Sequence, residues 1–356
     1  MAYTTIDDPS AYFQTTLWTG NGGTQSITFS GLNDMQPDWV WIKSRSAGEH
    51  PVIHDSVRGA NYQLYPNQTA AESNYSGRVT AFNSNGFSIG GDNEVNQNSQ
   101  TYVAWNWKAG TSFTNDASST GIGTIDSAGS VNTDAGFSIV SYTGNGSAGA
   151  TVAHGLGSAA NLLIVKKRSS TAQWVFGSTG LDSSWDNFLF LDSTSAKGNT
   201  DNVFNDTAPT STVFSIGNAG DTNASSQTYV AYCFAEKQGY SKFGSYVGNG
   251  NADGAFVYTG FKPAFVMVKR SSGTDNWMIT DDKRSSSDGN NVIDRRILPN
   301  LTNAEYTNTT PMDILSNGFK HRDGDDINNA SGSTYIYMAF AENPFTSSAG
   351  TPVTAR

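Results

Sequence analysis

The chain is poor in cysteine, in charge and in long apolar runs. It has one cysteine among 356 residues, Cys233, so no disulfide can form within it, and we expect this thiol to be a small buried hydrophobe in a strand. Charged residues make up 15% of the chain and the net charge is −10. This balance argues against nucleic acid or an anionic membrane as the main ligand, because clustered cations hold such partners. No stretch reaches the roughly 18 apolar residues of a membrane helix, so we expect no membrane insertion.

Strong helix formers and targeting signals are scarce as well. Leu, Lys and Glu are few, whereas Gly, Ser, Thr and Asn are abundant, a composition that favours strands and turns over helices. The start of the chain, MAYTTIDDPS, has neither basic residues nor an apolar run, so we expect no secretory signal. Synthesis in a reducing cytoplasm fits the single thiol.

What the chain contains instead is one passage used three times. A Gly-Asn-Gly turn occurs at positions 20–22, 144–146 and 248–250. Each turn is followed by a strand that ends in cations, and each repeat closes on a further strand that reads QTYVAWNW, QTYVAYCF or STYIYMAF. The repeat length of about a hundred residues is that of a whole domain and exceeds that of a solenoid repeat. The sequence therefore predicts three similar modules.

These repeats divide the chain into six segments. They are a leader (1–11), unit 1 (12–109), a linker rich in Gly, Ser, Thr, Asn and Asp (110–135), unit 2 (136–238), unit 3 (239–345) and a polar tail (346–356). Units 2 and 3 follow one another almost directly, so we expect them to pack together. The leader precedes the first repeat and is our candidate for an anchoring end.

Alternation within the closing strands indicates that both of their faces are covered. In unit 1, Val103, Trp105 and Trp107 alternate with Tyr102 and Ala104, and both faces are largely uncharged. No window shows a clean helical period, and short strands between Gly-rich turns are typical of antiparallel sandwiches. We predict an all-β chain of three tandem antiparallel β-sandwich modules that are lectin-like or jelly-roll-like.

Several runs resemble a known class of protein. They are TLWTGNGGTQSITFSG, PDWVWIKSRS, QTYVAWNWKAG, GNGSAGATVAHGLG and TYIYMAFAENPF, and they are similar to virion structural proteins of marine tailed bacteriophages that are described as tail-fibre-like or lectin-like repeat proteins. The resemblance covers nearly the whole chain. It implies a virion protein on the tail or the outer capsid surface, made in the host cytoplasm, with other virion proteins as partners. We expect a homo-oligomer, and the resemblance offers no catalytic motif.

Enzyme motifs are weak in this sequence. Residues 86–90 match the Gly-x-Ser-x-Gly pattern of a nucleophile elbow, but no helical segment follows, so we interpret them as a strand and turn. The histidines lack metal-ligand spacing, and Glu236 and Glu342 occupy matching positions after two closing strands. We expect no enzyme and no cofactor. A polysaccharide depolymerase that uses an Asp pair across subunits is the alternative.

Three kinds of residue are candidates for binding. Trp174, Trp185 and Trp277 lie in polar surroundings and could serve as platforms for a host-surface glycan. A cationic strand end recurs in each unit and predicts a solvated end, an intramolecular carboxylate partner, or a site for an acidic glycan or capsid protein; its residues are Lys43, Arg45, Lys166, Lys167, Arg168, Lys269 and Arg270. The loop with Asp323, Asp325 and Asp326 is either a simple turn or a Ca²⁺ site.

Two roles compete at this stage. A tail fibre or knob would display repeated glycan-binding surfaces whose avidity compensates for weak single sites. A head decoration protein would sit on the shell. The chain has no heptads and no shaft, which favours a compact knob over a long fibre. Three modules arranged with pseudo-threefold symmetry would suit a threefold or sixfold site on a virion, whereas an extended row would contradict that hypothesis.

Overall fold

The chain is mostly β, with 44% of residues in strands and 6% in helices. The structure, a computed structural model, describes residues 3–285 and 291–353. Residues 1–2 of the predicted leader, residues 286–290 of unit 3 and residues 354–356 of the predicted tail lie outside the described residues. The sheets are antiparallel throughout their strand pairs. The prediction of a β-rich antiparallel chain is confirmed.

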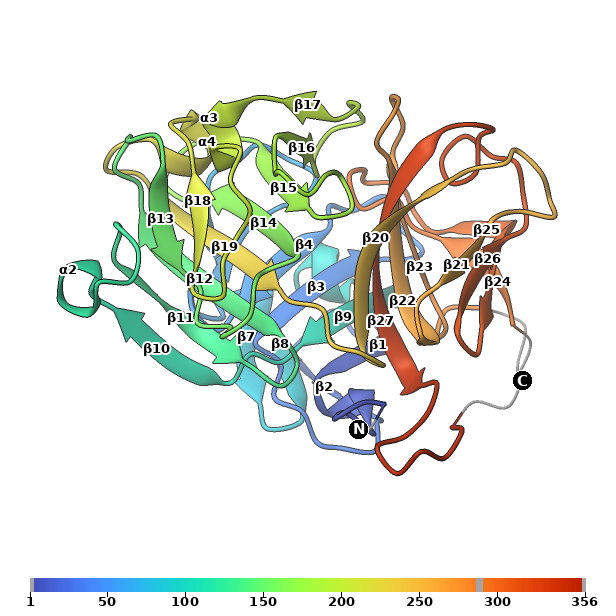
Figure 1. Cartoon of the computed structure of the whole chain (residues 1–356). Coiled ribbons are helices and arrows are strands. Elements are labelled where there is room, and N and C mark those ends of the chain that lie inside the picture. The colour runs from blue at the N-terminus through green and yellow to red at the C-terminus, as the bar shows by residue number, and fades with distance from the viewer. Residues whose placement is uncertain (1–2, 286–290, 354–356) are drawn as a thin grey trace.

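The larger sheet of each unit has the same strand order. The opening strand of the unit pairs with its closing strand, the closing strand also pairs with the second strand, and the second strand pairs with the third. In unit 1 these are β1 (Phe13–Thr19), β9 (Thr101–Trp107), β3 (Trp39–Ser44) and β4 (Val52–Asp55). In unit 2 they are β12 (Phe137–Thr143), β19 (Thr228–Phe234), β14 (Leu162–Lys167) and β15 (Trp174–Ser178). In unit 3 they are β20 (Ser241–Val247), β27 (Thr334–Pro344), β22 (Phe261–Arg270) and β23 (Trp277–Asp281). Figure 1 shows unit 2 on the left in green and yellow and unit 3 on the right in orange and red.

A second, smaller sheet accompanies each of these. The strands are β2 (Gln25–Thr28), β8 (Gly86–Ile89) and β7 (Val79–Asn83) in unit 1, and β13 (Ala150–Ala153) and β18 (Val213–Ile216) in unit 2. In unit 3 they are β21 (Phe256–Tyr258), β26 (Gly318–His321), β25 (Tyr306–Leu315) and β24 (Val292–Arg296). The remaining short strands of these units are β5 (Tyr62–Gln63), β6 (Ser73–Asn74), β16 (Asn187–Phe190) and β17 (Gly198–Asn199).

Helices are confined to single turns in the part of the chain that the structure describes. They are η1 (Pro9–Ala11), α1 (Asn93–Asn96), α2 (Ala117–Thr120), α3 (Asp201–Phe204) and α4 (Gly220–Asn223). None of the described helices has the length or the apolar character needed to span a membrane.

The larger sheet of each unit is buried on both faces. In unit 1 one face packs on the second sheet, where Val40 and Tyr102 share a cluster with Phe87 and Ile89, and units 2 and 3 have corresponding clusters. We call each of these a private core. This arrangement explains why the closing strands are uncharged on both sides, and that prediction is confirmed.

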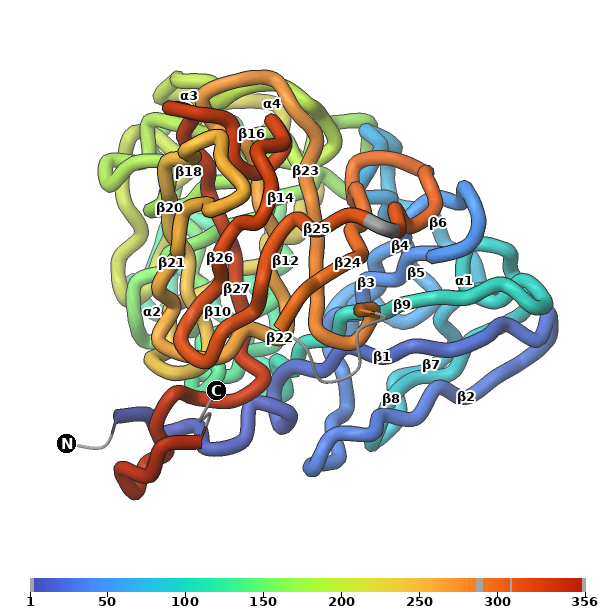
Figure 2. Tube along the Cα trace, turned by 90° about the vertical axis from the view of Figure 1, so that its right-hand side faces the viewer, coloured from blue at the N-terminus to red at the C-terminus, as the bar shows by residue number. Residues whose placement is uncertain are grey.

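The opposite faces of the three larger sheets meet in one central core. Its cluster includes Trp39 and Trp105 from unit 1, Tyr232 from unit 2, and Phe265 and Phe340 from unit 3. The ring centroids of Trp39 and Tyr232 are 4.6 Å apart. Figure 2 shows the blue strands of unit 1 beside the orange and red strands of unit 3. The units therefore surround a common core and do not form an extended row.

The repeated Gly-Asn-Gly turn is held by a buried asparagine. In unit 2 the Nδ2 group of Asn223 donates to Oδ1 of Asn145 (3.3 Å) and to the carbonyls of Ser147 (2.9 Å) and Gly217 (2.8 Å). Its Oδ1 accepts from the backbone N–H of Asn145 at 2.9 Å. Equivalent networks involve Asn96 in unit 1 and Asn329 in unit 3, at the same place before the closing strand.

Each of the two glycines of this turn is required for a different physical reason. A Cβ on Gly144 would lie 2.5 Å from the carbonyl oxygen of Ala224, so only glycine allows the close approach. Gly146 has a φ of 75°, a left-handed conformation that favours glycine. The signature that defines the repeat is thus a requirement of local packing.

The segment predicted as a linker is part of a sheet. Within 110–135, β10 (Thr111–Asn115) pairs with β11 (Ser127–Asn132), and β11 pairs with β12. Small hydroxyl and amide side chains are acceptable there because these strands lie at the outer end of an eight-stranded sheet. Only unit 2 has this β10–β11 hairpin among the described residues.

The described part of the predicted leader packs on the body of the protein. Ile6 belongs to the central core. Thr4 Oγ1 donates to the carbonyl of Gln238 at 2.7 Å, and Asp7 accepts from the backbone N–H of Ser348 in the predicted tail at 2.6 Å. The described residues of the leader are therefore part of the folded body, and their role as an anchoring end stays a prediction.

Candidate functional site

The first lysine of each basic strand end joins two units. Lys43, Lys166 and Lys269 occupy the same position of the second strand and are fully buried. Their Nζ groups donate to backbone carbonyls of a neighbouring unit: Lys43 to Thr302 (3.0 Å), Lys166 to Thr69 (2.9 Å) and Lys269 to Thr194 (3.3 Å). Burial lowers the pKa of all three ammonium groups to about 8. These cations are structural and cannot meet an external ligand.

The arginines of two strand ends reach carboxylates of a neighbouring unit. Arg168 forms a two-pronged ion pair with Glu72 across the first interface, between units 1 and 2. Arg45 does the same with Glu305 across the second interface, between units 1 and 3. Of the interpretations that the sequence left open, an intramolecular carboxylate partner is the one that the structure supports for both arginines.

The third interface, between units 2 and 3, lacks this ion pair. At this interface the backbone N–H of Lys197 donates to the carbonyl of Ser271 (3.0 Å). The equivalent backbone hydrogen bonds at the other two interfaces run from Glu72 to the carbonyl of Arg168 and from Glu305 to that of Arg45. Serine and lysine therefore stand where the other interfaces have arginine and glutamate. Arg270 lies 3.7 Å from Asp326. Lys167 is buried at 8% exposure.

The three tryptophans proposed as glycan platforms are buried. Trp174, Trp185 and Trp277 are at most 1% exposed, so the prediction of an exposed aromatic platform at these positions is wrong. Trp174 Nε1 donates to the carbonyl of Tyr65 (2.9 Å), and Trp277 Nε1 donates to that of Phe190 (3.0 Å). Both bonds cross between units. The polar sequence surroundings of Trp174 and Trp277 reflect these interfaces, whereas Trp185 lies in the private core of unit 2.

The acidic loop of unit 3 is not assembled as a calcium site. Asp323 accepts from Nδ2 of Asn328 at 2.9 Å, whereas Asp325 pairs with Arg296 at 2.8 Å. Within residues 3–285 and 291–353, no group of three or more His, Cys, Asp or Glu side chains could hold a metal ion. Of the two interpretations of this loop, the turn is the one that the structure favours.

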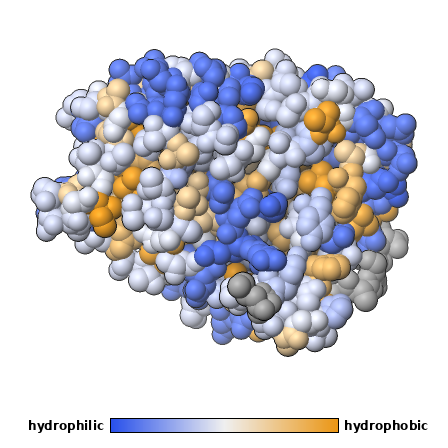
Figure 3. Space-filling view, viewed as in Figure 1, coloured by the Kyte–Doolittle hydropathy of each residue, from blue (hydrophilic) through white to orange (hydrophobic). Residues whose placement is uncertain are grey.

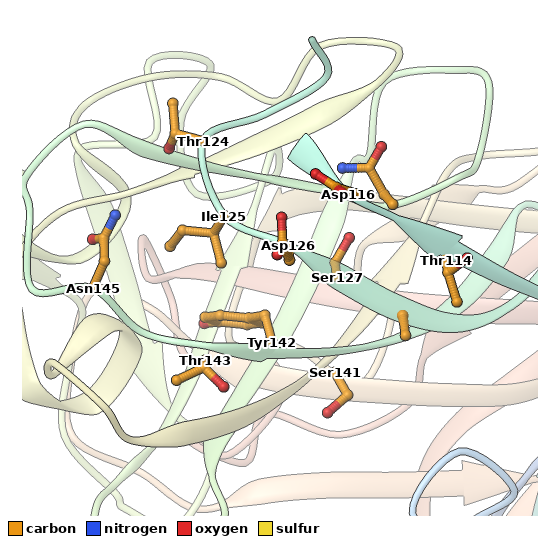
Figure 4. A pocket seen from close by; sticks show the side chains of 12 residues that line it. Thr114, Asp116, Thr124, Ile125, Asp126, Ser127, Ser141, Tyr142, Thr143 and Asn145 are labelled. Carbon is orange, nitrogen blue, oxygen red and sulfur yellow. The ribbon is translucent and has the colours of Figure 1, made fainter. Parts of the chain in front are cut away.

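A polar hollow of about 660 Å³ lies between the β10–β11 hairpin and the Gly-Asn-Gly turn of unit 2. Figure 4 shows that one wall comes from the hairpin and the other from β12 and the residues that follow it. Its lining residues include Thr114, Asp116, Thr124, Asp126, Ser127, Ser141, Thr143 and Asn145, together with the largely buried Ile125 and Tyr142. Hydroxyl, amide and carboxylate groups thus converge from two elements.

The carboxylates of this hollow are fixed by the local turn. Oδ1 of Asp116 accepts from the Ser118 hydroxyl (2.7 Å) and from the Ser119 N–H (3.1 Å), and these bonds lower the pKa of Asp116. Oδ1 of Asp126 accepts from the Ala117 N–H at 2.9 Å. No cation is among the described residues that line the hollow. The arrangement can accept hydrogen bonds from a hydroxyl-rich ligand and disfavours an anionic one.

Sequence reasoning did not find this hollow, although a signal was present. The run from 110 to 135 is rich in Ser, Thr, Asn and Asp, a pattern that also predicts a linker. A repeat that is interrupted by an extra segment in one copy marks the place where a shared scaffold has been elaborated, and binding residues often lie on such additions.

A second hollow, of about 590 Å³, lies over the first interface. Its lining is mostly amide and hydroxyl side chains, with one carboxylate: Asn67, Gln68, Thr69, Ala70, Thr171, Gln173, Asp192 and Ser193. Burial raises the pKa of Asp192 to about 6. Its Oδ1 accepts from the backbone N–H of Trp174 at 3.1 Å.

A third space, of about 100 Å³, lies between units 1 and 3. It is lined in part by Thr15 from β1 and by Asp282 and Glu342 from unit 3. Oγ1 of Thr15 and Oδ1 of Asp282 are buried and have no hydrogen-bond partner among the described residues. Burial raises the pKa of Asp282 to about 7, and the charge of Glu342 contributes in the same direction.

Comparison with known proteins places the chain in a family. The model for a domain of unknown function, DUF7483, matches residues 8–344, so the chain belongs to that family. The matched span includes all three units, and the family domain therefore corresponds to the whole body around the central core. The search of curated proteins and the search of solved structures each returned no match.

Proposed function

We propose that this member of the DUF7483 family is a non-enzymatic structural protein of a bacteriophage virion, a compact tail knob that binds a neutral host-surface glycan. We also infer that its units are tandem lectin-like β-sandwich modules. The resemblance of the repeated sequence runs to phage virion proteins motivates the first part. The packing of three similar units around one central core supports a compact knob with internal pseudo-threefold symmetry.

The observation that carries the glycan-binding role is the hollow beside the β10–β11 hairpin. Its hydroxyl, amide and carboxylate groups offer the hydrogen bonds that sugar hydroxyls form. Its two carboxylates favour a neutral glycan over an acidic one, because Arg168, which donates to the lining hydroxyl of Ser141 at 3.1 Å, is itself paired with Glu72. The lowered pKa of Asp116 suits binding better than hydrolysis, because a glycosidase needs one carboxyl group of raised pKa.

Glycan binding is tested with a matched pair of variants. Thr143→Arg places a long side chain in the hollow, and Thr19→Arg is the control at the equivalent, exposed position of unit 1. On an array of neutral and acidic host glycans we expect the wild type and Thr19→Arg to bind a neutral glycan and Thr143→Arg to lose at least ten-fold in affinity. Equal binding by all three proteins would contradict the assignment of this hollow.

Localisation on the intact particle tests the structural role. Immunogold labelling at the tail tip would support the knob. Label over the head would favour the alternative, a capsid decoration protein, for which the pseudo-threefold body also suits a symmetric site. Absence of label from purified virions would refute both. Release of reducing sugar from host envelope extract would instead indicate a depolymerase.

A further inference from the structure

The opening strands of unit 3 leave an apolar edge uncovered. In the described part of the chain, β27 is the only strand that pairs with β20, whose first residue also bridges to Lys237, and β26 is the only strand that pairs with β21. Val247, Phe256 and Tyr258 on these strands are 59%, 47% and 55% exposed. Figure 3 shows apolar side chains gathered on the right of the view, over the region of β20 and β21 in Figure 1.

Strand pairing identifies the same edge in the other units. Val247 faces the first residue of the closing strand, Thr334, as Thr143 faces Thr228 and Thr19 faces Thr101. Phe256 and Tyr258 lie on either side of the central residue of the first strand of the second sheet. The first strands of the second sheets in units 1 and 2 pair in the same register, which identifies the equivalent residues. The equivalent residues are Thr19, Ser26 and Thr28 in unit 1 and Thr143, Thr151 and Ala153 in unit 2.

In unit 2 this edge is occupied by the chain itself. The backbone N–H groups of Thr124 and Ile125 donate to the carbonyl of Thr151 (2.9 and 3.1 Å), and the hydroxyl of Ser127 donates to that of Ala153 (3.0 Å). The strand that begins at Ser127 then pairs along β12. Ile125 inserts its side chain into the private core of unit 2.

The three edges therefore have the same backbone arrangement but differ in the side chains that they present and in whether another segment covers them. Unit 1 presents hydroxyl side chains, which suit contact with water. Unit 2 is covered by an extended segment. Within residues 3–285 and 291–353, unit 3 presents apolar side chains without such an extended segment. The leader reaches only the end of β21, where the Tyr3 hydroxyl lies beside Tyr258 and donates to the carbonyl of Gly260 (2.6 Å). A cluster of exposed apolar groups at an unpaired strand edge marks an interaction site.

Part of the β20 backbone is available for pairing. The N–H of Phe243 points to the outer edge, where it donates to Oε1 of Glu236 at 2.8 Å. Alternate residues turn their N–H groups to the same edge, so those of Ser245 and Val247 also face outward. Gly180 of unit 2 packs against Gly244, since a Cβ on Gly180 would lie 2.5 Å from the Gly244 oxygen. The segment 245–247 lies beyond these contacts.

We propose that the β20–β21 edge of unit 3 binds an extended segment of another polypeptide. The segment adds a short strand to 245–247, as β11 does along β12 in unit 2, and places apolar side chains against Val247, Phe256 and Tyr258. Main-chain hydrogen bonds supply affinity in this mode, and the apolar side chains supply selectivity. The proposal does not depend on the glycan-binding role, because the polar hollow belongs to unit 2.

A variant that copies unit 1 tests this edge. In Val247→Thr/Phe256→Ser/Tyr258→Thr each residue is replaced by its unit 1 equivalent, so we expect the fold to persist; thermal unfolding and the far-ultraviolet circular dichroism spectrum check this. A displayed library of random 12-residue peptides is selected on the intact wild-type protein, with counter-selection on the triple variant. We expect enriched peptides with alternating apolar residues and at least ten-fold weaker binding to the variant.

Hydrogen exchange then locates the bound peptide. We expect protection of the Ser245 and Val247 amides and little change in the equivalent residues of unit 1. Equal binding to the triple variant, protection elsewhere, or no enrichment would overturn the proposal. It would also be overturned if the wild type dimerises and the variant does not, which would make the edge a self-association face. Loss of glycan-array binding in the variant without peptide enrichment would make it a sugar platform.

Discussion

Arg168 and Glu72 lie 96 residues apart in the sequence and form a two-pronged ion pair across the first interface, with distances of 3.0 and 2.9 Å. Arg58 also donates to Glu72, at 3.0 Å, and its Nε donates to Asp55 at 2.5 Å. A hydroxyl from the neighbouring unit, that of Tyr232, donates to the same Asp55 carboxylate at 2.7 Å. One glutamate therefore joins two cations that belong to different units.

We expect Glu72→Gln to destabilise the protein strongly. The substitution leaves Arg58 and Arg168 facing a neutral amide at a largely buried position, and loss of charged hydrogen bonds of this kind costs roughly 2–3 kcal/mol. The free energy of unfolding from denaturant titration measures the effect. Asp134→Asn at an exposed site is the control and should change stability by less than about 0.5 kcal/mol. A similar value for both variants would show that the ion pairs contribute no stability.

The third interface should accept the missing ion pair. Units 2 and 3 are joined by the short connection between Phe234 and Ser241, which keeps them at a high effective concentration without an ion pair. We expect Ser271→Arg and Lys197→Glu together to stabilise the protein by roughly 0.5–1 kcal/mol relative to the sum of the single changes. A double-mutant cycle measures this coupling. A coupling of zero would mean that Ser271 and Lys197 do not correspond in geometry to the other two pairs.

Sequence patterns predicted what is local to a unit and missed what lies between units. The Gly-Asn-Gly turns and the two-sided closing strands follow from backbone and packing requirements within one repeat, and these can be read from spacing and alternation. Trp174 and Lys166 have polar neighbours in the sequence and so resemble surface residues. Their burial arises from another unit more than ninety residues away, and periodicity within one unit carries no information about that contact.

The β10–β11 hairpin was missed for a different reason. Small polar residues form linkers and outer edge strands equally well, and the choice depends on whether a neighbouring strand offers a free edge. β12 offers that edge to β11. The candidate hollow is a consequence of this pairing, so it could not be predicted without the sheet order.

The buried lysines should make stability depend on alkaline pH. Lys166 has a pKa of about 8 in the folded chain and an ordinary value of 10.5, so between these values the unfolded chain binds more protons and stability rises with pH. Each such lysine contributes at most roughly 1.4 kcal/mol per pH unit in this window. Denaturant titration at pH 7.5 and 9.5 should show a smaller rise for Lys166→Met than for the wild type. The exposed Lys197→Met should match the wild type, and a matching rise in Lys166→Met would refute the assignment.

The buried Asn223, which holds the Gly-Asn-Gly turn of unit 2, should be essential to the stability of that turn. Asn223→Ala removes the donors and the acceptor that hold the Gly-Asn-Gly turn and leaves buried carbonyls without partners, which should cost roughly 2–4 kcal/mol. Faster hydrogen exchange at Asn145 and Gly146 would identify the turn as the first site to open. Asn98→Ala, at an exposed asparagine, is the matched control. Equal stability of the two variants would show that the repeat signature has no stabilising role.

Ionisation of the Asp282 carboxyl group should lower the free energy of unfolding as the pH rises toward neutrality. Its pKa is about 7 in the folded chain, mainly through burial, against an ordinary value of 3.8. The folded chain therefore binds more protons between these values, and the contribution to stability, fully present below about pH 4, is lost as the pH rises to about 7. We expect Asp282→Asn to match the wild type near pH 4 and to exceed it by roughly 1–3 kcal/mol at pH 7.5.

Denaturant titration of both proteins at the two pH values isolates this contribution, because the other titrating groups, among them the buried His54, His154 and His321, are common to both proteins. Thr15→Val removes another buried polar atom of the same space that has no hydrogen-bond partner, and it should stabilise the protein at both pH values alike. A gain for Asp282→Asn that is the same at pH 4 and pH 7.5 would mean that the carboxyl group stays in one protonation state, and the space between units 1 and 3 would then be a packing defect without any proton linkage.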